Sequence, residues 1–259
     1  MRHGDFSALA ENYAISRPDY SKRVLNGVLG MCSRPVDELD VADIGAGTGI
    51  LTRMLAEHGV GSVIAVEPDD AMRCEGIKHT QGCGVRWVSG TAESTGLPDG
   101  SVDLLTMASA FHWADFDTAV VEFHRALSDN GLFVSLWNPR LVARNPVLTN
   151  IENRLKSMMG EAPSRVSSGF SPFTDGLESQ LRKSGCFGEV SYLEDEHVVI
   201  FDHERYLAVW RSVNDVRVQL GEVQFAELLR YIEQAITDLD CIEATYLTRA
   251  WLARKMSSR

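Results

Sequence analysis

The sequence is short of the features that mark secreted or membrane proteins. Its five cysteines are odd in number, scattered and never spaced as CxxC, so they indicate neither a disulfide framework nor a zinc knuckle. No stretch approaches the roughly 20 apolar residues of a membrane span. The N-terminus also lacks the apolar core of a signal peptide. The sequence therefore predicts a cytoplasmic protein with free thiols and no membrane partner.

Positive charge is also scarce. Lysine and arginine number 25 against 36 aspartates and glutamates, which gives a formal net charge of -11. Nucleic-acid-binding proteins usually present a basic face to the phosphate backbone. We therefore expect no nucleic-acid partner and favour a small molecule. This charge pattern does not exclude a homodimer.

Short apolar runs alternate with helical stretches over the first 140 residues. This alternation is typical of βαβ units, and it predicts an α/β fold with a doubly wound, mostly parallel, seven-stranded Rossmann-like sheet with helices on both faces. The expected strands are 41–44, 62–66, 85–88, 102–107 and 132–137, followed by 188–200 and 242–253. The expected helices between them are 50–58, 69–79 and 115–128.

The two ends of the chain follow a different pattern. A helical segment over residues 6–15, and a second helix capped by Ser21, predict an N-terminal lid over residues 1–35. After the predicted core, 36–138, residues 139–259 are expected to form a helical cap and the last strands. In this part we predict a helix at 146–159 and a second helix that ends at Gly185. A third helix is predicted at 204–213 and, after a polar turn, a fourth at 223–239. We predict one domain over residues 1–259.

A glycine-rich loop, Gly45-Ala46-Gly47-Thr48-Gly49, follows the first expected strand and leads into a helix. Such a turn brings backbone N–H groups and a positive helix end to a ligand. A dinucleotide site would have GxGxxG or GxGxxA, whereas Ile50 here follows a GxGxG run. Glu67 ends the next strand, at the position expected for a carboxylate that binds ribose hydroxyls. Alternatively, the loop is an ordinary turn and Glu67 a solvated strand end.

Four segments together resemble the class I S-adenosylmethionine-dependent methyltransferases, and most closely their small-molecule, type 11-like branch. They are 41–49, 64–68, 90–98 and 101–105, with a "Y…RP.Y" segment at Tyr13, Arg17 and Pro18 before them and 110–113 after them. The resemblance implies S-adenosyl-L-methionine as the cofactor and methyl transfer to a small-molecule acceptor, and we expect a role in secondary metabolism.

The resemblance also assigns the cofactor site. Gly45, Ala46 and Gly47 would approach the methionine part, Glu67 would hold the ribose, and Ala92 would face the adenine. The family commonly has an acid where this chain has Thr91. The full set of implied cofactor-binding residues is Tyr13, Arg17, Gly45, Ala46, Gly47, Glu67, Pro68, Thr91, Ala92, Glu93 and Ser109. Asp43 is either a structural acid beneath the loop or a ligand of the cofactor's ammonium group.

Methyl transfer from a sulfonium mainly needs alignment of nucleophile, methyl group and sulfur, so a general base is optional. His112 and Tyr13 are the candidate catalytic residues, with His112 as the base; the alternative is that residues 111–113 only pack and cap. The aromatic residues of the late sheet and cap, Tyr206 and Trp210 among them, are expected to be mostly core. No metal is predicted. Cyclisation of the cofactor's aminobutyrate part, with release of methylthioadenosine, and a non-catalytic binding module remain as alternatives.

Overall fold

The computed structural model describes residues 16–160 and 169–256, and these are built around one seven-stranded sheet. The strand order is β3-β2-β1-β4-β5-β7-β6. Neighbours from β3 to β5 pair in parallel, whereas β7 runs antiparallel to both β5 and β6. The strands are β1 Asp40–Ile44, β2 Ser62–Val66, β3 Arg86–Val88, β4 Val102–Ala108, β5 Leu127–Trp137, β6 Phe187–Phe201 and β7 Ile242–Lys255. The predicted α/β class and all seven strands are confirmed.

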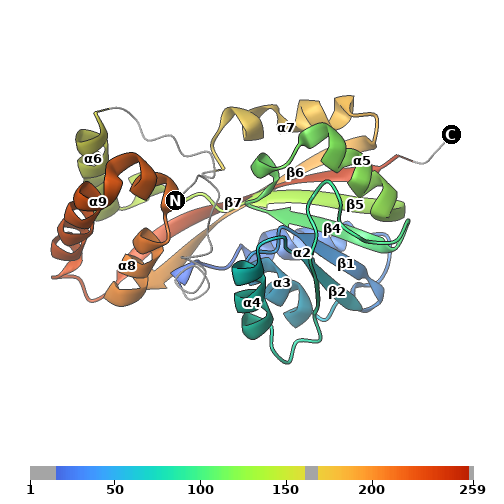
Figure 1. Ribbon diagram of the computed structural model, residues 1–259, viewed down its shortest axis with the longest axis horizontal. Helices are drawn as coiled ribbons and strands as arrows, with labels where there is room; N and C mark the ends of the chain where they lie inside the picture. The colour runs from blue at the N-terminus through green and yellow to red at the C-terminus, as the bar shows by residue number, and fades with distance from the viewer. Residues whose placement is uncertain (1–15, 161–168, 257–259) are drawn as a thin grey trace.

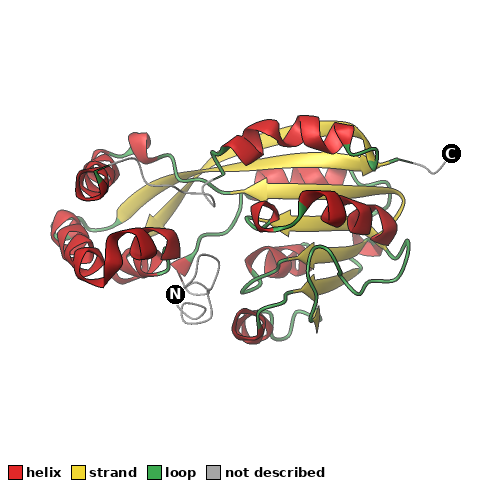
Figure 2. Ribbon diagram, turned by 45° about the horizontal axis from the view of Figure 1, so that its top comes forward, coloured by secondary structure: helices red, strands yellow, loops and turns green. Residues whose placement is uncertain are grey.

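Helices cover both faces of this sheet (Figures 1 and 2). On one face, α2 (Lys22–Gly30) and α3 (Ile50–Glu57) bury apolar side chains such as Leu25 and Leu55 against β1, β4 and β5. On the other face, α5 (Phe116–Ala126) and α7 (Pro172–Lys183) pack around Phe111 and Phe133. The helix α4 (Asp70–His79) follows β2. A stripe of apolar residues at helical spacing explains each of these packings.

The helix α7 corrects one expectation. We expected the helices between residues 139 and 185 to belong to the cap, but Leu177 and Leu181 of α7 are fully buried in the same core as α5. The neighbouring strands explain this position, because α7 leads directly into β6 and packs on β6 and β7. It is therefore a sheet-covering helix.

A second core lies at the other end of β6 and β7. The first half of β7 pairs with β6 beyond the end of β5, and Tyr246 there forms an isolated β-bridge with Arg140. There α6 (Pro146–Met159), α8 (His203–Arg211) and α9 (Asn214–Ile236) pack together on these strands, at the left of Figure 1. We call this unit the cap. The turn expected before residue 223 is largely helical, because Val216 and Leu220 are buried in the cap; only Gly221, with a φ of 73°, interrupts α9.

The chain enters the fold through residues 16–21, which contact both the sheet and the cap side. Ser21 caps α2 as predicted, since its hydroxyl accepts the N–H groups of Arg23 and Val24. Its own N–H donates to Thr248 of β7. The expected helix at residues 6–15, with Tyr13, lies outside the described residues, and the division of the chain into lid, core and cap stays a prediction. No helix within residues 16–160 and 169–256 is both long and apolar enough to cross a bilayer.

Candidate active site

A cavity of about 430 Å³ opens where the parallel strands end. The loops that follow β1, β2, β3 and β4 form its walls, together with the residues before α2. All ten predicted cofactor-binding residues within the described ranges line it: Arg17, Gly45, Ala46, Gly47, Glu67, Pro68, Thr91, Ala92, Glu93 and Ser109. Carboxyl ends of neighbouring parallel strands meet at one edge of a sheet, which is why these distant segments converge.

The glycine loop needs its glycines for the backbone path. Gly45 and Gly49 have φ angles of 63° and 79°, in the left-handed region that side chains disfavour. A Cβ atom on Gly45 would also lie 2.9 Å from the Cβ of Ala110. The loop N–H groups differ from expectation: Ala46 donates to the carbonyl of Val66 at 3.1 Å, and Gly47 donates to Glu67. The loop therefore allows a ligand to approach its backbone closely. The N–H groups of Ala46 and Gly47 already donate within the protein and do not serve the ligand.

Glu67 is buried in the cavity wall and held from two sides. Its Oε2 accepts the N–H of Gly47 at 2.8 Å, and its Oε1 accepts the N–H of Asp69 at 2.9 Å. Burial raises the pKa of Glu67, while these backbone donors oppose the rise. The carboxylate is thus fixed in place, and each oxygen keeps a lone pair for a further hydroxyl donor.

Asp43 lies beneath the loop and is 1% exposed. Its Oδ2 accepts the hydroxyl of Thr52 at 2.6 Å, and its Oδ1 accepts the hydroxyl of Thr106 at 2.9 Å. Burial raises the pKa of Asp43 to about 6, although both hydroxyl donors lower it. These contacts join β1, α3 and β4, as expected of a structural acid.

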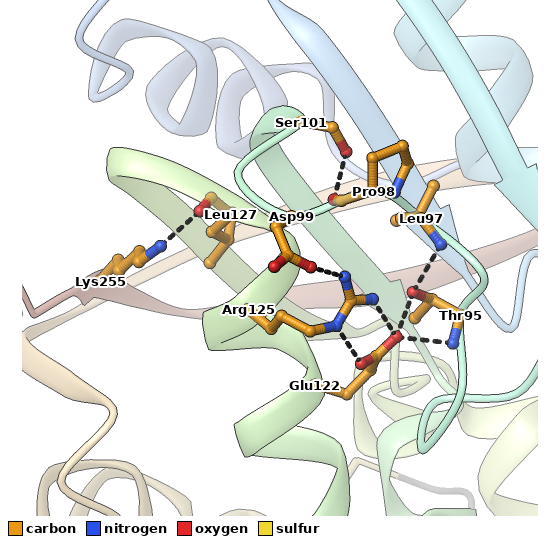
Figure 3. A network of polar contacts seen from close by, with 9 residues as sticks. All are labelled: Thr95, Leu97, Pro98, Asp99, Ser101, Glu122, Arg125, Leu127 and Lys255. Atoms are coloured by element: carbon orange, nitrogen blue, oxygen red, sulfur yellow. Dashed lines mark hydrogen bonds and ion pairs between the residues drawn. The ribbon is translucent and has the colours of Figure 1, made fainter.

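The loop that carries Thr91 to Glu93 is fastened to α5. Glu122 accepts the backbone N–H of Thr95 at 2.9 Å and the Thr95 hydroxyl at 2.6 Å (Figure 3). Arg125 bonds both Glu122 and Asp99, and this guanidinium lowers the pKa of Glu122 to about 2. Glu93, one of the predicted cofactor-binding residues, accepts the N–H of Asp115 at 2.8 Å. The loop therefore forms a fixed wall.

Two residues of the cavity wall, Tyr20 and Ser109, contact each other through their hydroxyl groups. The Tyr20 hydroxyl lies 3.1 Å from the Ser109 hydroxyl, and Ser109 has a φ of 51°, which is uncommon for a residue with a side chain. Arg17 reaches in the other direction and donates from Nε to the Ser212 hydroxyl at 3.1 Å, at the end of α8. The cavity wall is thereby connected to the cap.

His112 does not line the cavity, although Trp113 beside it does. Burial lowers the pKa of His112 to about 4, with Asp215 opposing the shift, so the imidazole is neutral at pH 7. Trp137 donates its indole N–H to Nδ1 at 3.4 Å, which leaves the ring proton on Nε2. Nε2 is buried and has no hydrogen-bond partner among the described residues. In this arrangement the Nε2–H of His112 can donate a hydrogen bond, and the role of His112 as a base stays a prediction.

Sequence reasoning did not single out several cavity residues. Thr48 is 1% exposed, and its hydroxyl has no hydrogen-bond partner in the described part of the chain. Asn138 lines the cavity just after β5, and its side chain bonds the carbonyl of Asp19 and the hydroxyl of Thr248. Thr48 is part of the glycine loop, and this position was the signal that could have identified it. For Asn138 no local signal was available, because its position depends on where β5 ends.

Comparison with known proteins agrees with this site. Residues 42–135 match the family model described as "Methyltransferase domain". An uncharacterized methyltransferase of Mycobacterium tuberculosis is 34% identical over 139 residues, which cover 52% of each chain. An uncharacterized methyltransferase of Schizosaccharomyces pombe is 26% identical over 250 residues, 95% of this chain and 94% of the relative. The chain thus spans about half the length of the mycobacterial relative.

The fold comparison extends over nearly the whole chain. A candidate type II methyltransferase from Anaeromyxobacter dehalogenans has a TM-score of 0.66 at 20% identity, over 92% of this chain and 97% of that one. The match over residues 42–135 and the relatives named methyltransferase support the predicted resemblance to the class I S-adenosylmethionine-dependent methyltransferases, and the structural comparison supports the fold.

The residues present fit the cofactor of this family, S-adenosyl-L-methionine. The glycine loop follows a backbone path that a Cβ on Gly45 would obstruct by meeting Ala110, and Thr48, whose buried hydroxyl has no partner among the described residues, lines the same cavity. Glu67 offers the free acceptor positions that ribose hydroxyls need.

Proposed function

We propose that the protein is an enzyme that transfers a methyl group from S-adenosylmethionine to a small-molecule acceptor. The observation that carries the proposal is the carboxylate of Glu67, fixed in the cavity wall by two backbone N–H groups and adjacent to the glycine loop. The size of the cavity and the net charge of -11 favour a small acceptor over a nucleic acid.

The residues of the chain would act by binding and orientation. When bound, S-adenosylmethionine supplies a methyl group on a sulfonium whose leaving group is already good. Glu67 would accept the ribose hydroxyls, Ala92 and Pro68 would border the adenine, and Arg17 would bond the cofactor's carboxylate. The His112 imidazole, neutral with its proton on Nε2, would donate a hydrogen bond and take up no proton at that atom.

Product analysis tests the reaction. The protein is incubated with S-adenosylmethionine, alone and with pooled small metabolites, and the nucleoside products are separated. S-adenosylhomocysteine that forms only with an acceptor supports methyl transfer. Methylthioadenosine formed without an acceptor supports cyclisation of the cofactor instead. Absence of both products, together with tight binding, supports the binding module.

Calorimetry tests the proposed binding of the ribose by Glu67. Glu67→Gln keeps the side-chain length but turns one acceptor oxygen into a donor, so we expect S-adenosylmethionine to bind about tenfold or more weakly, with the fold intact. The matched control is Glu57→Gln, an exposed glutamate in α3 that pairs with Arg53. Equal affinity of the Glu67 and Glu57 variants would refute the ribose role. The cytoplasmic location and the homodimer stay predictions.

A further inference from the structure

Four residues of the cap and its strands form a cluster around one guanidinium, that of Arg140. It lies 5.0 Å from the ring centroid of Trp210 and 5.8 Å from that of Tyr206, and its Nη1 donates to the Tyr206 hydroxyl at 3.4 Å. Tyr206 and Trp210 are one helical turn apart on α8, so both rings face the same side. Arg140 also pairs with Tyr246 of β7 through an isolated antiparallel β-bridge, and the charge of Arg140 acts on the Tyr246 hydroxyl. We call these four residues the Arg140 cluster.

Two hydrogen-bond donors of this cluster lack acceptors. Arg140 Nε and Trp210 Nε1 are buried and have no hydrogen-bond partner within the described residues. Both atoms carry a hydrogen at any accessible pH, so each can only donate. Trp210 is 1% exposed, and a buried donor without a partner costs free energy. The complement that both positions require is an oxygen acceptor.

The charge of the cluster is also not neutralised by a direct ion pair. Within residues 16–160 and 169–256, Arg140 has no carboxylate within 4.0 Å; Glu152 acts on its charge only from farther away. Arg205 packs on the Phe201 ring at 4.9 Å and likewise forms no ion pair in the described chain. As a residue Arg140 is half-buried, whereas its Nε is buried.

Positive charges converge on one buried hydroxyl. Burial raises the pKa of Tyr246, which is 5% exposed, and the charges of Arg140, Arg17 and Arg205 oppose that rise. All three guanidinium groups are therefore within electrostatic range of Tyr246. In a chain with a net charge of -11, such a local concentration creates a field that attracts an anion.

The Arg140 cluster adjoins the cofactor cavity but is separate from it. Arg17 lines the cavity and donates to Ser212, two residues after Trp210. Asn138 also lines the cavity, two residues before Arg140. Arg140 itself is not part of the cavity wall. A ligand held by Arg140 would therefore lie beside the cofactor cavity rather than within it.

We propose that the Arg140 cluster is the subsite that binds a carboxylate of the methyl acceptor, and hence that the acceptor is a small organic acid. This inference rests on the proposed function. Arg140 would hold the carboxylate through its planar fork, and the Trp210 indole N–H would supply a further donor. These residues fix the acceptor and its specificity; they take no part in breaking the sulfonium bond.

Calorimetry with paired ligands tests the subsite. The full chain, loaded with S-adenosylhomocysteine, is titrated with small mono-, di- and tricarboxylic acids and with the amide of each acid. We expect at least one acid to bind at least about tenfold more tightly than its amide. Arg140→Gln and Trp210→Phe should each reduce this acid-to-amide ratio about tenfold, with the affinity for S-adenosylmethionine unchanged. Arg144→Gln, which removes an exposed arginine paired with Glu196, is the matched control.

The ratio of acid affinity to amide affinity shows whether the carboxylate subsite exists. If every acid binds like its amide, or if Arg140→Gln retains the ratio of the unmodified chain, the carboxylate subsite is wrong. Should Arg140→Gln fail to fold, Arg140→Lys keeps the charge but loses the fork, and Trp210→Phe keeps the ring but loses the donor; an unchanged ratio in both overturns the inference equally. Failure of S-adenosylmethionine to bind at all would instead refute the proposed function.

Discussion

Asp43 provides the most direct test of the energetics beneath the glycine loop. Its carboxyl group is 1% exposed, and its pKa is raised from the ordinary value of 3.8 to about 6, first by burial and further by the nearby charge of Glu67. Between these pH values the folded protein keeps a proton that the unfolded chain has released. The free energy of unfolding therefore falls as the pH rises from about 4 to 6.

The magnitude follows from the size of the shift. A pKa that rises from 3.8 to about 6 on folding corresponds to about 3 kcal/mol of stability lost at neutral pH, because each pKa unit is worth 1.36 kcal/mol. Asp43→Asn removes the charge and keeps the shape. The Asn oxygen can accept from Thr52, and the Thr106 hydroxyl, which already lies 3.4 Å from the carbonyl of Ala42, can turn to that carbonyl and accept from the Asn amide. We therefore expect Asp43→Asn to gain stability relative to the unmodified chain as the pH rises.

Urea unfolding, followed by circular dichroism between pH 4.0 and 7.5 without cofactor, measures the effect. The difference between Asp43→Asn and the unmodified protein should grow by about 3 kcal/mol over this range. Asp117→Asn, which removes an exposed acid in the first turn of α5, controls for the loss of one negative charge. A difference that is constant with pH would refute the account. Binding of S-adenosylmethionine to the same variant separates the two roles of Asp43: a structural acid predicts a loss below about tenfold, and an ammonium ligand a larger one.

Three further substitutions test other parts of the site. His112→Gln keeps a donor but removes the imidazole, so turnover should fall less than about tenfold; a loss of a hundredfold or more would support the general base. Glu122→Gln should cost about 1–3 kcal/mol in urea unfolding at pH 7, and this cost should shrink as the pH falls below 4.5 toward 2, where the unmodified carboxylate becomes protonated; an equal cost at all pH values would contradict the role of the Arg125 pair. Gly45→Ala should destabilise the fold by about 1 kcal/mol or more and weaken S-adenosylmethionine binding, because its φ is 63° and its Cβ would meet Ala110; unchanged thermal unfolding would contradict the strain.

The strands and most helices could be predicted because they depend on local patterns. Period-2 and period-3.6 apolar spacing located β1 to β7, and Ser21 identified the start of α2. The glycine loop and Glu67 were predictable for a similar reason, since their order along a strand–loop–helix unit places them at the same sheet edge. The position of α7 was not predictable, because its apolar stripe suits either the sheet or the cap.

The residues of the candidate site divide along the same line. The family resemblance, the cofactor and the residues of the cavity wall could be predicted from the order of amino acids, because they follow from short motifs whose members are close together in the chain. The hydrogen bond of His112 with Trp137 of β5, and the contacts of Arg140 with Trp210 and Tyr246, became apparent only from the packing of the folded chain. Those contacts join residues 25 or more positions apart, so their chemistry arises from how β5, β7 and α8 pack rather than from any local pattern.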